Sequence, residues 1–154
     1  MLSRSGVHAI RAMVTLASVT PGEYCGTNSI AESTGSPRNY LGKLLLLLSR
    51  HGLVESQKGL GGGFRLTRSS DQISLFQVVE AIDDVARWKE CAFGGKTCSD
   101  ATPCMVHTRW CHVRDAYMTF LEDTTVAQLI SSRAVTTPMS AALIPGVNPS
   151  AGKH

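Results

Sequence analysis

A cluster of glycines between two short alternating runs constrains the fold of this chain more than any other feature. Residues 53–58 and 64–67 alternate apolar and polar side chains, and four of the five residues between them, 59–63, are glycine. Alternation with a period of two is typical of strands, and glycine tolerates the positive φ angles of tight turns. The pattern predicts a β-hairpin.

Two helices are predicted ahead of the hairpin. Apolar residues at helical spacing mark the first over residues 6–18, and Thr20-Pro21-Gly22 ends it. The second is short, begins with Thr27 or Asn28 as its cap, and stops at Gly35.

A third helix has a stronger start signal. Ser36 can cap it, and Pro37 fits the first helical position, where its missing N–H costs nothing. It is predicted to run to about His51, with Gly52 at its C-terminal end. A helix, a turn containing glycine and a second helix make the helix-turn-helix pattern.

Beyond the hairpin, the sequence predicts a helix over residues 75–82, a loop over 90–103 and a long helix from Cys104. Thr124 or Thr125 is expected to cap a last short helix that ends near Ile130. A narrow apolar stripe spaced 4, 3, 4 and 3 residues apart follows the long helix and is typical of a helix that pairs with another helix. Its members are Val106, Trp110, Val113, Tyr117 and Phe120.

Composition points to a globular chain outside the membrane. The hydrophobic content is 43% and the mean hydropathy is +0.02. The longest apolar run, Leu44–Leu48, is far shorter than the roughly 20 residues that span a bilayer. No secretory segment is recognisable at the N-terminus, so we expect a cytoplasmic protein. In a reducing compartment, clustered cysteines more often bind metal or sense redox state than form disulfides.

Charge is unevenly distributed. Residues 36–70 carry six Lys/Arg against one acid, whereas residues 71–90 carry five acids against two bases. A basic segment over the third helix and the hairpin is expected of a surface that binds a polyanion. The competing interpretation is a packing unit whose charges are simply solvated.

In helix-turn-helix proteins, the start of the second helix of the motif reaches base edges in the major groove. Arginine can pair with guanine, and asparagine with adenine. Bare glycines let the hairpin approach DNA, and a basic residue beside them can enter the minor groove. Tyr40 fits a phosphate contact or a core position equally well. The predicted DNA-contacting residues are Ser36, Arg38, Asn39, Tyr40 and Lys43 on the helix, and Lys58, Gly61, Gly62 and Arg65 on the hairpin.

Four candidate metal ligands lie close together in the sequence as Cys91-x6-Cys98-x5-Cys104-x2-His107. Thiolates and imidazole suit iron–sulfur clusters and zinc alike, so the spacing alone leaves both open. We expect Cys104 and His107 to share one face of the long helix. Cys111 lies on the same face and is an alternative fourth ligand, or else a buried thiol. Cys25 is expected to be an ordinary free thiol.

The chain resembles the Rrf2 family of bacterial winged-helix regulators over roughly residues 1–130. Matching stretches include Ala9-Ile10-Arg11-Ala12-Met13, Ile30-Ala31-Glu32 and Gly52-Leu53-Val54. The most specific is Gly59-Leu60-Gly61-Gly62-Gly63-Phe64, where the family's wing typically reads Arg-Gly-x-Gly-Gly-Gly-Tyr; Lys58 and Phe64 are mild departures.

Within that family, the chain is similar to the iron–sulfur-sensing branch that includes IscR and NsrR. Cys98, Cys104 and His107 match the branch's spacing, and the gap after Cys91 is one residue longer. The resemblance implies a cluster held by Cys91, Cys98, Cys104 and His107, with the 2Fe-2S form favoured over 4Fe-4S. In some members helix 1 of the partner subunit supplies the fourth ligand, which makes His8 a further candidate.

The fold class expected is mainly α (α+β), a winged helix-turn-helix with a long C-terminal dimerisation helix. We expect a DNA-binding domain over 1–88, a cluster-binding loop over 89–104, a dimerisation helix with a short terminal helix over 105–131, and a disordered tail over 132–154. The predicted function is a homodimeric regulator that binds double-stranded operator DNA under control of the cluster. The alternative is a cluster-free regulator with zinc or a cysteine thiol switch. No catalytic constellation is present, so an enzyme is not expected.

Overall fold

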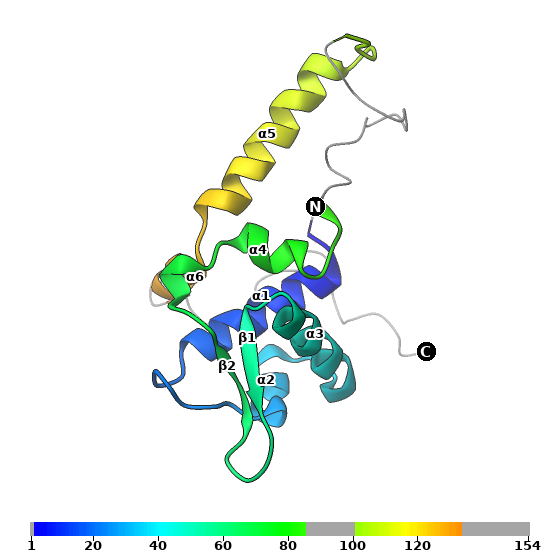
Figure 1. Ribbon diagram of the computed structural model, residues 1–154. Coiled ribbons are helices and arrows are strands. Elements are labelled where there is room, and N and C mark those ends of the chain that lie inside the picture. The colour runs from blue at the N-terminus through cyan, green and yellow to red at the C-terminus, as the bar shows by residue number, and fades with distance from the viewer. Residues whose placement is uncertain (1, 86–100, 134–154) are drawn as a thin grey trace, which may run out of the picture.

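A computed structural model describes residues 2–85 and 101–133 of the chain (Figure 1). Within these ranges it is mostly helical, with one small antiparallel sheet. None of the described helices is long and apolar enough to cross a membrane. In chain order the elements are α1 (Arg4–Ala17), α2 (Thr27–Thr34), α3 (Arg38–Arg50), β1 (Val54–Gln57), β2 (Gly63–Leu66), α4 (Leu75–Glu80), α5 (His107–Asp123) and α6 (Val126–Arg133), with a 3₁₀ turn at Ser70–Gln72.

The first three helices pack around one apolar core. α1 contributes Ala9 and Met13, and α3 contributes Leu41, Leu45 and Leu48, all of them completely buried. The spacing of the leucines places them on one stripe of α3, which is why this segment forms a helix that packs against α1. Burial of each large side chain stabilises the fold by about 1.5–3 kcal/mol.

The turn between α2 and α3 differs in part from expectation. Gly35 ends α2 in the left-handed conformation (φ 64°), as predicted. The predicted caps are wrong. Gly26, not Thr27 or Asn28, precedes α2, and Pro37 precedes α3 without any side-chain cap. Ser36 lies one residue too early to cap α3, and its hydroxyl is turned towards α1.

The glycine-rich hairpin forms as predicted. β1 and β2 pair antiparallel, with Val54 opposite Leu66 and Gln57 opposite Gly63. The hairpin is tied to the α1–α2 loop because Cys25 and Phe64 exchange two backbone hydrogen bonds of 2.9 Å. Gly63 is required at this junction, since a Cβ there would lie 2.2 Å from the Cys25 carbonyl oxygen.

The C-terminal helices follow the predicted order, with boundaries shifted by two or three residues. Ser74 caps α4 in a capping box with Gln77. Thr125 and Gln128 exchange equivalent hydrogen bonds at the start of α6, which confirms the predicted cap. α5 begins at His107, however, three residues later than expected.

α5 extends away from the body as a long arm, and α6 returns the chain to α1 (Figure 1). Along this arm Val113 is 59% exposed and Phe120 49% exposed. Tyr117, in the same stripe, is half-buried against the cluster formed by Leu75 and Leu121.

Asp83, just after α4, lies where several elements meet. The Ser3 hydroxyl donates to its Oδ1 at 2.8 Å, and a Cβ on Gly6 would lie 2.9 Å from its Oδ2. Burial, and then the charge of Asp83, raise the pKa of Tyr117 on α5. The first turn of α1 therefore packs closely against the chain that leads out of α4.

Candidate nucleic-acid interface and candidate metal centre

The exposed side of α3 is polar and basic at its N-terminal end. Arg38, Asn39 and Lys43 are exposed there, whereas Leu41 and Leu44 face the core. Arg38 and Asn39 fall in the first turn, and Lys43 follows about one turn later. The helix thus presents two base-pairing side chains and a cation on a face that makes no core contact.

A shallow hollow of about 430 Å³ joins this end of α3 to the hairpin. Arg38 of α3 and Lys58 of the hairpin both line it, and Gly62 and Gly63 form part of its wall. The start of α2, residues 26–28, completes the lining, and no side chain forms a capping hydrogen bond with the backbone N–H groups there. N–H groups at a helix start and two nearby cations are groups that bind phosphate oxygens.

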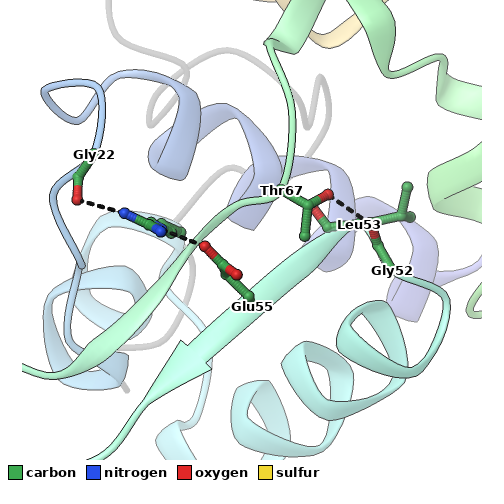
Figure 2. Close-up of polar contacts among 6 residues, drawn as sticks. Gly22, Gly52, Leu53, Glu55 and Thr67 are labelled. Carbon is green, nitrogen blue, oxygen red and sulfur yellow. Dashed lines mark hydrogen bonds and ion pairs between the residues drawn. The ribbon is translucent and has the colours of Figure 1, made fainter.

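Arg65 is held within the hairpin base. Its guanidinium pairs with Glu55 across the strands and donates to the Gly22 carbonyl oxygen at 3.0 Å (Figure 2). It also lies 4.6 Å from the centre of the Tyr24 ring. The hydrogen bond to Glu55 raises the pKa of Arg65 above its ordinary value. Arg65 therefore ties β2 to β1 and to the α1–α2 loop, whereas Lys58 lies exposed at the hollow.

Two predicted contact residues on the helix-turn-helix are engaged with α1. Ser36 is only 7% exposed, and its Oγ is 2.6 Å from Nδ1 of His8. Tyr40 is half-buried, with its hydroxyl 2.6 Å from Ser5 Oγ. The prediction that Ser36 offers its hydroxyl to DNA is corrected, because that hydroxyl faces α1.

Of the predicted metal ligands, Cys104 and His107 are described, and Cys91 and Cys98 lie outside the described residues. Cys104 is half-buried in the turn before α5, and its carbonyl accepts the His107 backbone N–H at 3.0 Å. The expectation that both residues share one helical face is wrong, because α5 begins only at His107. Within the described part of the chain, no three candidate ligands come together.

Cys111 lies one turn further along α5. Its Sγ is 3.7 Å from Nε2 of His107, which is 8% exposed. Cys111 is thus half-buried beside the imidazole, which the i, i+4 spacing within a helix explains.

Cys25, the expected free thiol, and His8, the further ligand candidate, both have structural partners. Cys25 pairs with β2, and burial raises the pKa of its thiol, which disfavours the reactive thiolate. His8 is engaged with Ser36 and packs edge-on against Tyr40, with ring centroids 5.7 Å apart. Sequence reasoning missed this group because no local pattern links a residue of α1 to a turn 28 positions later.

Residues 2–132 match the Rrf2 family, described as an iron-dependent transcriptional regulator. The chain is 30% identical over 134 residues to the HTH-type transcriptional regulator IscR of Pectobacterium carotovorum. The aligned region covers 87% of this chain and 81% of that protein. It is 31% identical over the same length to IscR of Sodalis glossinidius, with the same shares covered.

Solved structures share the fold. CymR, the global cysteine regulator of B. subtilis, superposes with a TM-score of 0.72 at 25% identity, covering 86% of this chain and 97% of that one. T. potens IscR gives a TM-score of 0.70 at 23% identity, covering 95% and 93%. These similarities confirm the predicted fold class, a mainly helical winged helix-turn-helix with a small sheet. The chain belongs to the Rrf2 family of transcriptional regulators, which are DNA-binding proteins and not enzymes.

Proposed function

We propose that this chain is a homodimeric regulator whose binding to operator DNA is controlled by an iron–sulfur cluster. The residues that would hold the cluster are Cys91, Cys98, Cys104 and His107. The observation that carries the proposal is that a half-buried cysteine, Cys104, lies three residues before a buried histidine, His107, at the start of α5, and that a backbone hydrogen bond of 3.0 Å joins the two residues. The iron-dependent description of the family and the similarity to IscR proteins support it.

The donor set fits such a group chemically. Thiolates and one imidazole are soft and intermediate ligands that iron–sulfur clusters accept. When bound, a cluster supplies a cross-link that depends on iron supply and is sensitive to oxidation.

The DNA-binding role falls on α3 and the hairpin. We assign the start of α3 to the major groove, with Arg38 and Asn39 at base edges and Lys43 as a nearby cation. Lys58 and the bare glycines Gly61 and Gly62 approach the adjacent backbone or minor groove. The hollow between Arg38 and Lys58 supports this assignment, because it brings the two contact regions to one side of the molecule.

The dimer role falls on α5. Val113 and Phe120 leave a large apolar surface uncovered on the projecting arm. A second copy of α5 would cover this surface, since the stripe from Trp110 to Phe120 has the 3-4-3 spacing of helices that pair side by side. An operator with two half-sites would then match the two copies.

Control of DNA binding requires that the ligand region and α3 be linked. α5 starts at the proposed ligand His107, three residues after Cys104, and its further turns pack on α4. α4 leads to Asp83, which contacts the first turn of α1, and α1 packs on α3. A shift at the start of α5 can therefore change the balance between two arrangements of α3 in the dimer.

The second candidate is a cluster-free regulator with zinc or a thiol switch. The 3.7 Å contact between Cys111 and His107 favours it, because it places a thiol beside an imidazole, two groups that zinc accepts as ligands. The resemblance to CymR, named as a cysteine regulator, also supports it.

The deciding experiment measures iron, acid-labile sulfide and visible absorbance on protein purified without oxygen. We expect bound iron and sulfide in the wild type, and loss of both in Cys91→Ala, Cys98→Ala and Cys104→Ala. His107→Ala should retain a more labile cluster, since one imidazole among four ligands is the most replaceable. Cys111→Ala and Cys25→Ala are matched controls that should keep the absorbance.

Other outcomes separate the alternatives. Loss of colour in Cys111→Ala but not in His107→Ala would establish a four-cysteine site. Loss of colour in a His8 variant would identify His8 of α1 as the fourth ligand. A colourless wild type that contains zinc, or no metal, would overturn the cluster and leave the cluster-free regulator.

A further inference from the structure

The first turn of α3 is held to the body by few groups. Pro37, Arg38 and Asn39 are all exposed, and no side chain caps the helix start. The buried leucines of α3 begin only at Leu41. An uncapped turn without apolar anchors is prone to fray, because its first N–H groups have no partners within the helix.

Polar contacts to α1 flank this turn on both sides. Ser36, just before it, lies with its Oγ 2.6 Å from Nδ1 of His8, and Tyr40, at its end, lies with its hydroxyl 2.6 Å from Ser5 Oγ. The His8 ring also packs edge-on against the Tyr40 ring. One α1 side chain therefore touches both ends of the exposed turn.

Ser36 is itself fixed from the other side. The Thr34 hydroxyl lies 2.9 Å from Ser36 Oγ and 2.8 Å from the Ile30 carbonyl oxygen, and Thr34 is 4% exposed. A buried hydroxyl between two such neighbours has little freedom, and removal of one partner leaves a polar group unsatisfied.

We propose that His8 and Ser36 are positioning residues for DNA recognition: their contact holds the uncapped first turn of α3, so that Arg38 and Asn39 meet base edges in one orientation. The proposal rests on the proposed use of α3 as the helix that reads DNA. The two residues touch no DNA themselves. Their loss should therefore lower discrimination between DNA sequences more than it lowers binding to DNA in general.

The test uses two duplexes, one enriched from a random-sequence pool by the wild-type protein and one with the same composition in scrambled order. His8→Phe keeps a ring against Tyr40 but lacks Nδ1, and Ser36→Ala removes the hydroxyl. Each should weaken binding to the enriched duplex about three- to tenfold, the effect of one lost hydrogen bond, and change the scrambled duplex by less than about twofold.

His8→Asn is the matched control, since its amide keeps a polar atom close to the position of Nδ1. It should bind the enriched duplex within about twofold of the wild type. The double variant His8→Phe with Ser36→Ala should bind the enriched duplex no less tightly than whichever single variant binds it less tightly. The two effects should not add, because both substitutions remove the same contact. Amide hydrogen exchange in His8→Phe should be faster at Ser36 and Leu41, the flanking positions whose N–H groups are bonded to the carbonyls of Ala31 and Pro37, and unchanged at Leu45 and Leu48.

Equal losses on both duplexes together with a lowered unfolding midpoint would overturn the proposal in favour of a purely structural contact. Unchanged binding and exchange in both single variants would overturn it too. Failure of the proposed function is recognised separately. In that case the wild type enriches no duplex, or Arg38→Ala binds both duplexes as the wild type does, and the exchange data still show whether the contact holds the turn.

Discussion

At the scale of single residues, the basic side chains divide into two kinds. Arg38 and Lys58 are exposed and line the hollow, whereas Arg65 is engaged with Glu55, Gly22 and Tyr24. Position in the sequence does not distinguish them, since all lie in the same basic segment. Their interaction partners distinguish them. These partners also determine whether a substitution should affect the recognition of base sequence, the affinity for DNA in general, or the stability of the hairpin.

Arg38→Ala should weaken binding to an enriched operator selectively, because a bidentate base contact discriminates by about 1–3 kcal/mol. Lys58→Ala should weaken all duplexes alike and lower the salt dependence by about one unit, as loss of a phosphate contact does. Titrations of both variants at several salt concentrations measure the two effects. Equal losses on operator and random DNA for Arg38→Ala would remove its base-reading role.

Glu55→Gln should strengthen binding to DNA of any sequence. The substitution removes the acid that holds Arg65 and leaves an additional positive charge on the hairpin. The expected result is a steeper salt dependence, by about one unit. Glu122→Gln, at an exposed position on α5, changes net charge equally and should leave the slope unaltered. A similar gain in both variants would mean that net charge, not the release of Arg65, is responsible.

At the scale of elements, glycines in α3 and in the hairpin have opposite roles. Gly42 lies inside α3, and a Cβ there would meet nothing within 4 Å. Gly63 begins β2 at φ 153°, with the Cys25 carbonyl oxygen in the place of a Cβ. Gly42 therefore destabilises α3, whereas Gly63 allows β2 to pair closely with the α1–α2 loop.

Gly42→Ala should therefore raise the free energy of unfolding by about 0.5–1 kcal/mol, because alanine loses less backbone entropy in a helix. Gly63→Ala should lower it by roughly 2 kcal/mol or more, through strain and the clash with Cys25. Denaturant titrations measure both changes. Stabilisation by Gly63→Ala would show that the contact with the α1–α2 loop is dispensable.

How far the sequence predicts the structure depends on the range of the interactions. Gly35, the hairpin and the Thr125 cap follow from local patterns, and the structure confirms them. The start of α5 was predicted too early, since residues 104–106 offer no side-chain cap and the helix begins at His107. The contact between His8 and Ser36 lies beyond local patterns, because it joins an α1 side chain to a distant turn. The ligand set stays a prediction, since Cys91 and Cys98 fall outside the described residues.

At the scale of the whole molecule, α5 separates two functions in space. The helix and hairpin that we propose to contact DNA belong to the body, and the proposed pairing surface lies on the arm (Figure 1). Substitutions on the arm should thus change assembly without unfolding the body.

Val113→Asp with Phe120→Asp should produce a folded monomer, because both side chains are largely exposed in the single chain and make few contacts within it. Sedimentation velocity measures the state of association, and circular dichroism the fold. Thr119→Asp, exposed on the same helix but outside the stripe, is the matched control and should stay dimeric. A double variant that still sediments as a dimer would place the interface elsewhere.

The thermal stability of this protein should depend on its concentration. Val113 and Phe120 are largely exposed in one chain, and in the proposed dimer a second copy of α5 would bury them. Mass action then makes the folded dimer more stable as it becomes more concentrated, by about 1.4 kcal/mol for each tenfold increase in the regime where unfolding yields separate chains. In a cell, a scarce regulator of this design would be easier to unfold, and so to degrade, than an abundant one.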